Sequence, residues 1–223
     1  MTSPLPRPKG RLARIDQSRT AETALRLLDE SGLESLTMRR LADAMGVQAG
    51  ALYRYFATKQ DLLTAMAERM LADIPASAAN GPGAAGDWSE RLTGLARAMR
   101  TALLARRDGA RVFAGTHSDG AHTLGFADAL TGVLREAGFS DEDAARALMA
   151  VISFTVGLTL EEQAVLQPGP ANPERLRRAV SPERFPHLAA TLPTLASTDF
   201  TAHFEFGLRL IIQGLYVLPR DRP

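Results

Sequence analysis

The chain has 223 residues, with 26 Lys and Arg against 25 Asp and Glu, so its formal net charge is +1. This near-balance, with 45% hydrophobic and 23% charged residues, indicates a folded globular protein and excludes a disordered or polybasic chain. The absence of cysteine excludes a disulfide framework, a thiolate metal site and a cysteine nucleophile. Most of the basic residues are arginines: 24 are Arg, and only Lys9 and Lys59 are lysines.

The first 14 residues form a predicted basic, extended arm, because they carry four cations, no acid and three prolines that disfavour helix. They contain no apolar segment followed by a small-residue cleavage site, so we expect a cytoplasmic protein. The longest weakly polar run, 147–160, is about 14 residues long and is closed by Arg146 and Glu161. A membrane-spanning helix needs about 20 residues, so no membrane association is expected.

Apolar periodicity along the chain is helical, and no run alternates as a strand does, so the predicted fold class is all-α. In the first part we expect helices over 16–32, from Thr37, over about 48–54 and over 59–74. Gly46 permits a tight turn between the second and third, and Thr58-x-x-Asp61 resembles a capping box. Residues 15–74 therefore predict a helix-turn-helix DNA-binding domain.

Residues 75–86 are Pro, Gly, Ala, Ser and Asn without charge, and they predict a linker to a second domain over 87–223. The helices expected there cover 88–106, 122–137, 141–166 and 199–217, with a short one near 182–190. The proline-rich break at 168–173 leads into a region of short helical pieces and loop.

The segment from Leu36 to Leu63 combines Leu36-Thr37, Leu41-Ala42, Met45-Gly46-Val47, Leu52-Tyr53, Tyr55-Phe56, Lys59 and Leu62-Leu63. With these residues at these spacings, it resembles the DNA-binding domain of the tetracycline-repressor (TetR) family. It implies a regulator that binds a double-stranded DNA operator. Residues implied to face the bases are Arg39, Gln48, Ala49, Ala51 and Tyr55, and those implied to contact phosphates are Thr37, Tyr53, Thr58 and Lys59.

Simpler interpretations exist for some of these residues. Leu52 and Phe56 are expected in the core, and Arg39 could belong to a solvated face. For the basic arm two interpretations stay open: it enters a minor groove, or it is a solvated tail.

The second part is similar to the tetracycline-repressor subgroup at Asp87-Trp88, 107–112, Gly115-Thr116, 136–140 and 154–161. The resemblance implies a homodimer through helices 141–166 and 199–217. Small residues on the first helix and apolar residues on the second support it, although a monomer core is the alternative. The residues concerned are Ala147, Ala150, Ser153, Gly157, Phe204, Leu208, Ile211, Ile212 and Leu215.

The effector pocket implied by the resemblance departs from the subgroup. Phe113 stands where the subgroup has the histidine that binds the magnesium of its drug complex, so a magnesium–tetracycline effector is not expected. The positions that match the pocket suit a mainly apolar small molecule, with no cofactor and no metal. These predicted ligand contacts are Leu95, Met99, Phe113, Thr116, Ala129 and Glu161.

Two other functions are also compatible with parts of the sequence. His117, Asp119 and His122 are spaced closely enough to ligate a metal, but short polar residues are also common in Gly-rich loops. The sequence has no phosphate loop, nucleophile elbow or zinc-binding helix motif, so no enzyme is predicted. The other rival is a DNA-binding regulator without an effector. In the favoured interpretation, helix 59–74 transmits effector binding to the DNA-binding domain.

Overall fold

The structure is a computed structural model that describes residues 16–74, 87–166 and 173–220. Over these ranges it is helical and contains no strand, which confirms the predicted fold class. The predicted arm at 1–14 and linker at 75–86 lie outside the described residues, so the proposed domain boundaries stay predictions.

The first part contains α1 (Gln17–Ser31), a short 3-10 turn (Leu33–Ser35), α2 (Met38–Met45), α3 (Ala49–Leu52) and α4 (Lys59–Leu71). Side chains of Asp16, Thr37 and Thr58 cap α1, α2 and α4 by accepting hydrogen bonds from backbone N–H groups. Two bounds differ from prediction. Helix α3 is shorter than 48–54, because Gln48 is extended, and α4 ends at Leu71, after which the chain turns.

The second part contains α5 (Trp88–Leu104), α6 (Gly109–Ala114), α7 (Ala121–Glu136), α8 (Asp141–Leu166), α9 (Pro173–Ala179), α10 (Pro186–Leu195) and α11 (Phe200–Tyr216). Helix α6 was not predicted, because six residues make less than two turns and give no periodic signal. Helix α10 begins at Pro186 rather than near 182, since proline suits the first turn of a helix.

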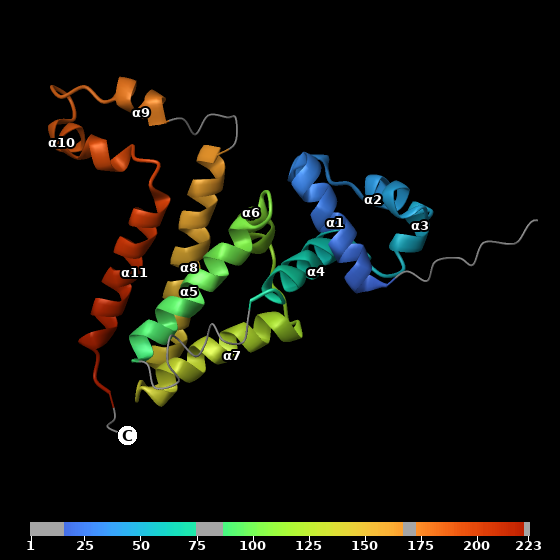
Figure 1. Cartoon of the computed structure of the whole chain (residues 1–223), viewed down its shortest axis with the longest axis horizontal. Coiled ribbons are helices and arrows are strands. Elements are labelled where there is room, and N and C mark those ends of the chain that lie inside the picture. The colour runs from blue at the N-terminus through green and yellow to red at the C-terminus, as the bar shows by residue number, and fades with distance from the viewer. Residues whose placement is uncertain (1–15, 75–86, 167–172, 221–223) are drawn as a thin grey trace, which may run out of the picture.

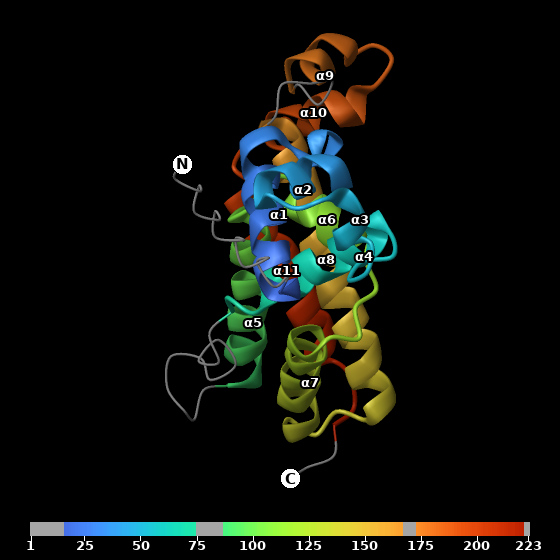
Figure 2. The same cartoon turned by 90° about the vertical axis from the view of Figure 1, so that its right-hand side faces the viewer.

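Helix α4 joins the two parts into one core. It packs against α1 on one side and against α5, α6 and α7 on the other. Its buried residues Leu62, Met66 and Met70 are spaced by four along one face and belong to a hydrophobic cluster that runs through both parts. Figure 1 shows α1 to α3 on the side of the molecule opposite α11, with α4 between, and Figure 2 views the molecule from that side.

Helix α8 is long and apolar enough to cross a membrane by length and composition alone. One face of it, however, is buried at Val151, Thr155 and Thr159, and it packs against α5, α6, α7 and α11. This packing is that of a core helix. Its opposite face is exposed and includes Met149 and Gly157.

Candidate nucleic-acid interface and ligand cavity

The turn between α2 and α3 is fixed by local chemistry. The Thr37 hydroxyl oxygen accepts a hydrogen bond from the Arg40 backbone N–H at 3.2 Å and so begins α2. Gly46 ends α2 in the left-handed conformation (φ 66°, ψ 31°), which glycine adopts without steric cost. The chain can then enter α3 after only two further residues, which is the predicted helix-turn-helix arrangement.

The segment around α3 has one face buried in the core and one face exposed. Leu52 and Phe56 are buried, which confirms their predicted core role, whereas Tyr53 and Tyr55 are 51% and 42% exposed. Among the other residues predicted to read bases, Arg39 and Gln48 are exposed, and Ala49 and Ala51 are half-buried. Tyr53 is the C-cap of this small-residue helix and Tyr55 lies in the turn after it, so two large exposed aromatic side chains follow α3 directly and indicate a contact surface.

Three of the four predicted phosphate contacts, Thr37, Thr58 and Lys59, lie at helix N-termini, whereas Tyr53 lies at the C-terminal end of α3. Thr58 and Asp61 form a full capping box, with N···O distances of 2.9 and 3.1 Å, and Lys59 is the exposed first residue of α4. In the caps of α2 and α4 the threonine oxygen accepts a hydrogen bond, so its O–H stays available as a donor. Helix N-termini favour anions because of their unpaired N–H groups and dipole. These two caps are therefore suited to phosphate oxygens.

Two sets of contacts hold the first part against the second. The Asp108 carboxylate accepts a hydrogen bond from the Leu33 backbone N–H at 2.8 Å, and Asp29 pairs with Arg106 at 3.0 Å. Asp108 is buried and has a left-handed φ of 56°, a conformation that costs free energy outside glycine and here positions the carboxylate. On α4, the Gln60 amide donates to the Gly115 carbonyl at 2.6 Å.

The role of Asp108 in holding the two parts together is not evident from its residue type. The one local signal in the sequence is Gly109, directly after it. A Cβ at Gly109 would overlap the carbonyl of Leu103, so only glycine fits where the chain turns back on α5.

The six predicted ligand contacts are spread over α5, α6 and the residues after it, α7 and α8. Leu95 and Met99 of α5 are buried in the core. Phe113 and Ala129 are half-buried on α6 and α7, and the Thr116 hydroxyl donates to the Phe113 carbonyl at 2.9 Å. Glu161, on an exposed turn of α8, lines a separate cavity.

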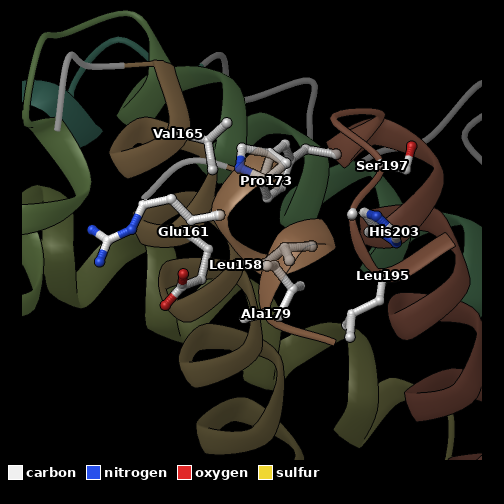
Figure 3. A pocket seen from close by; sticks show the side chains of 12 residues that line it. Leu158, Glu161, Val165, Pro173, Ala179, Leu195, Ser197 and His203 are labelled. Carbon is white, nitrogen blue, oxygen red and sulfur yellow. The ribbon is translucent and has the colours of Figure 1, made fainter. Parts of the chain in front are cut away.

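That cavity has a volume of about 690 Å³ and is formed by α8, α9, α10 and α11. Figure 3 shows its walls, with Leu158 and Val165 from α8, Ala179 from α9 and Leu195 from α10. Its polar groups come from Glu161, Arg175, Ser197 and His203. Of its lining residues only Glu161 is among the predicted ligand contacts, because the cavity depends on how α9 and α10 fold back onto α8 and α11.

The proposed metal ligands do not converge. In the described part of the chain, no group of three or more His, Cys, Asp or Glu residues is placed to hold a metal ion. His117, Asp119 and His122 are exposed. Their segment instead packs onto α4 through Glu68.

The predicted dimer residues require a correction. Ala147, Phe204, Leu208, Ile212 and Leu215 are buried within the single chain, so these residues belong to the monomer core. Ile211 is half-buried. Among the apolar and small residues that remain exposed are Met149, Ala150, Ser153 and Gly157 on α8 and Phe206, Leu210 and Gly214 on α11.

The fold and this surface define a two-part helical regulator with an N-terminal helix-turn-helix. The family model described as "Bacterial regulatory proteins, tetR family" matches residues 21–66, and that described as "Tetracyclin repressor-like, C-terminal domain" matches residues 81–218. The chain therefore belongs to the tetracycline-repressor (TetR) family.

Individual proteins show the same relationship. The chain is 42% identical over 205 residues to the class A tetracycline repressor from transposon 1721 of Escherichia coli, covering 92% of each. It is 66% identical to a possible TetR family transcriptional regulator from Streptomyces coelicolor A3(2), with a TM-score of 0.84 over 92% of this chain and 100% of that one. It is 28% identical to BioQ in complex with its double-stranded DNA operator, with a TM-score of 0.67 over 92% and 100% of the two chains.

Proposed function

We propose that this chain is a homodimeric repressor that binds a pseudo-palindromic operator and is released by a mainly apolar small molecule. The observation that carries the proposal is the exposed surface of α2 and α3, which presents Arg39, Gln48 and Tyr55 between two capped helix N-termini. BioQ, a relative of the same fold, is complexed with an operator. Proteins of this family are DNA-binding regulators, and we infer a cytoplasmic protein without catalytic activity.

Roles within the DNA interface follow from the chemistry of each side chain. The Arg39 guanidinium is suited to bidentate hydrogen bonds with guanine O6 and N7. Gln48 and Tyr55 can reach base edges, while Ala49 and Ala51 allow close approach and contact with a thymine methyl. Phosphate contacts by Thr37, Tyr53, Thr58 and Lys59 position the domain without reading sequence.

The dimer interface that we propose is the exposed face of α8 and α11. On α11, Phe206 and Leu210 are 56% and 57% exposed, and on the exposed face of α8 Met149 is accompanied by the small residues Ala150, Ser153 and Gly157. Small residues let two helices approach closely, so a partner's α8 and α11 could complete a four-helix bundle. Two-fold symmetry would then place the two copies of α3 roughly 34–36 Å apart or a multiple of that distance.

The effector class follows from the residues available in the second part. Both the predicted contacts around α5, α6 and α7 and the cavity beside α8 are mainly apolar, and Glu161 belongs to both sets. A mainly apolar molecule with a few polar groups fits such linings. The burial of Leu95 and Met99 also favours one alternative, a regulator whose second part only dimerises.

A magnesium–tetracycline complex does not fit these residues. Phe113 carries no metal ligand, and it packs half-buried against the core. We expect tetracycline with magnesium to leave the repressor on its operator. Release at micromolar drug would contradict the argument from Phe113.

One experiment tests the proposal as a whole. Duplexes bound by the protein are selected from a random pool, sequenced, and examined for inverted half-sites. The bound complex is then screened against apolar small molecules for release. Selection without an inverted repeat would contradict the operator model, and a screen without release would favour the effector-free alternative.

A further inference from the structure

Helix α7 begins without a cap of its own. Its N-cap residue is Gly120, which has no side chain to accept hydrogen bonds from the first N–H groups. The acceptor comes from α4 instead. The Glu68 carboxylate accepts hydrogen bonds from the His122 backbone N–H and from the Thr123 backbone N–H, the latter at 3.1 Å.

Two hydroxyl groups complete this cap. Thr123 Oγ1 donates to Glu68 Oε2 at 2.7 Å, and Ser118 Oγ donates to the same oxygen at 3.1 Å. Burial raises the pKa of Glu68, but the hydrogen bonds from Thr123, His122 and Ser118 outweigh it and hold the pKa below its ordinary value. The Glu68 carboxylate is therefore ionised, and its negative charge lies at the N-terminus of α7, which is the positive end of the helix dipole.

Gly120 provides the space for this contact. A Cβ on Gly120 would lie 2.7 Å from Glu68 Oε1, well inside van der Waals contact. The backbone of Gly120 has φ −71° and ψ 157°, which any residue can adopt. Glycine at this position leaves room for the Glu68 carboxylate, and a larger residue would displace that carboxylate from the cap.

Glu68 lies on the same helix as the proposed phosphate contact Lys59, about nine residues or 14 Å further along at 1.5 Å per residue. A rigid α4 thus connects the DNA surface at one end to the first turn of α7 at the other. We propose that Glu68 is a positioning residue, which fixes the DNA-binding domain on the second domain and so sets the spacing of the two α3 helices in the dimer. This inference rests on the proposed function, since the spacing matters only for a dimer whose two DNA-binding domains contact the two half-sites of one operator.

The test compares operator duplexes obtained by selection with the same duplexes carrying one extra base pair between the half-sites. One base pair moves a half-site by about 3.4 Å along the axis. We expect the wild-type dimer to bind the lengthened duplex about tenfold more weakly, and Glu68→Gln to reduce that penalty to under about threefold. Gln keeps the shape of the side chain but replaces an acceptor oxygen with a donor.

Two further variants separate the cap from other effects. Gly120→Ala should displace the carboxylate and reproduce the Glu68→Gln result, and it should add nothing in a Glu68→Ala background, where the space is free. Asp73→Asn is the matched control, because Asp73 is also an acid of the α4 end but pairs with Arg69 at 2.6 Å. It should keep the wild-type spacing penalty.

Amide hydrogen exchange tests the cap without DNA. The His122 and Thr123 amides should exchange faster in Glu68→Gln and Gly120→Ala than in wild type and Asp73→Asn. Unchanged exchange, or an unchanged spacing penalty in Glu68→Gln, would overturn the inference while leaving the proposed function intact. If the wild-type protein bound both duplexes with equal affinity, the model of a dimer on two half-sites would be refuted, and the inference with it.

Discussion

Arg100 on α5 and Glu162 on α8 form a bidentate salt bridge that is largely buried. Their N···O distances are 2.8 to 3.1 Å, and their side chains are 15% and 14% exposed. The Arg100 guanidinium also lies over the Phe204 ring, 5.2 Å from its centroid. One arginine therefore contacts α8 and α11 together, at the centre of the second part.

Removing one partner of this pair should destabilise the fold. Arg100→Met leaves Glu162 buried without its cation, and we expect a loss of about 2–4 kcal/mol in unfolding free energy. Urea unfolding followed by Trp88 fluorescence at fixed dimer concentration measures it. Arg97→Met is the control. Its partner Glu205 is 36% exposed, so the loss should stay below about 1 kcal/mol, and equal losses would show that burial is not the cause.

Substitutions in the DNA surface should separate reading from positioning. Lys59→Ala should weaken binding to all duplexes and lower the salt slope by about 1, because one phosphate contact is lost. Arg39→Ala should cost about 1–3 kcal/mol and relax base preference at one position of each half-site. Binding titrations at several salt concentrations measure both.

The control for these DNA variants is Arg135→Ala, which removes an exposed cation of α7 that is paired with Asp141. It should leave both the affinity and the salt slope unchanged. If Arg39→Ala kept the wild-type base preference in a renewed selection, direct readout by Arg39 would be refuted.

A charge placed on the exposed face of α11 should separate the dimer. Leu210→Arg would put an unpaired cation in the proposed bundle, so we expect monomers at micromolar concentration and loss of operator binding. Sedimentation velocity measures the state. Leu124→Arg on α7 is matched, since the two leucines are 57% and 56% exposed. A dimer that survives Leu210→Arg would place the interface elsewhere.

The Tyr216 hydroxyl should make stability depend on pH at both extremes. Its hydrogen bond to Asp87 lowers the pKa of that carboxyl below 3.8 and raises the pKa of Tyr216 above 10.0. The lowered pKa of Asp87 contributes stability above pH 3.8, and this contribution is lost as the pH falls and the carboxylate becomes protonated. The raised pKa of Tyr216 contributes stability below pH 10.0, and this contribution is lost as the pH rises and the hydroxyl ionises.

Tyr216→Phe removes both contributions. The difference in urea midpoint between wild type and Tyr216→Phe should therefore be largest between these limits and shrink on either side. Circular dichroism across the pH range measures it. Phe keeps the ring that packs against Trp88, so a difference that stays constant at every pH would refute the coupling between the Tyr216 hydroxyl and the titration of Asp87.

Features that depend on neighbouring residues could be predicted from the sequence, whereas contacts between distant segments could not. The caps at Thr37 and Thr58 and the turn at Gly46 depend on neighbouring residues only, and all three occur as expected. The Glu68 cap joins residues more than 50 positions apart, and nothing in either segment indicates the other. Likewise, the apolar pattern of α11 identifies a helix but does not say which apolar residues face its own core and which face a partner. Phe204 and Phe206 illustrate the difference, since one is buried and the other exposed.

The cation usage of the chain has a practical consequence at the start of α4. Lys59 is exposed, and the chain has only one other lysine, Lys9. Primary amines are the groups that acylating reagents modify, and guanidinium groups resist them. Besides the chain's α-amino group, such reagents have two sites on the whole protein, and one of them lies in the surface proposed to bind operator.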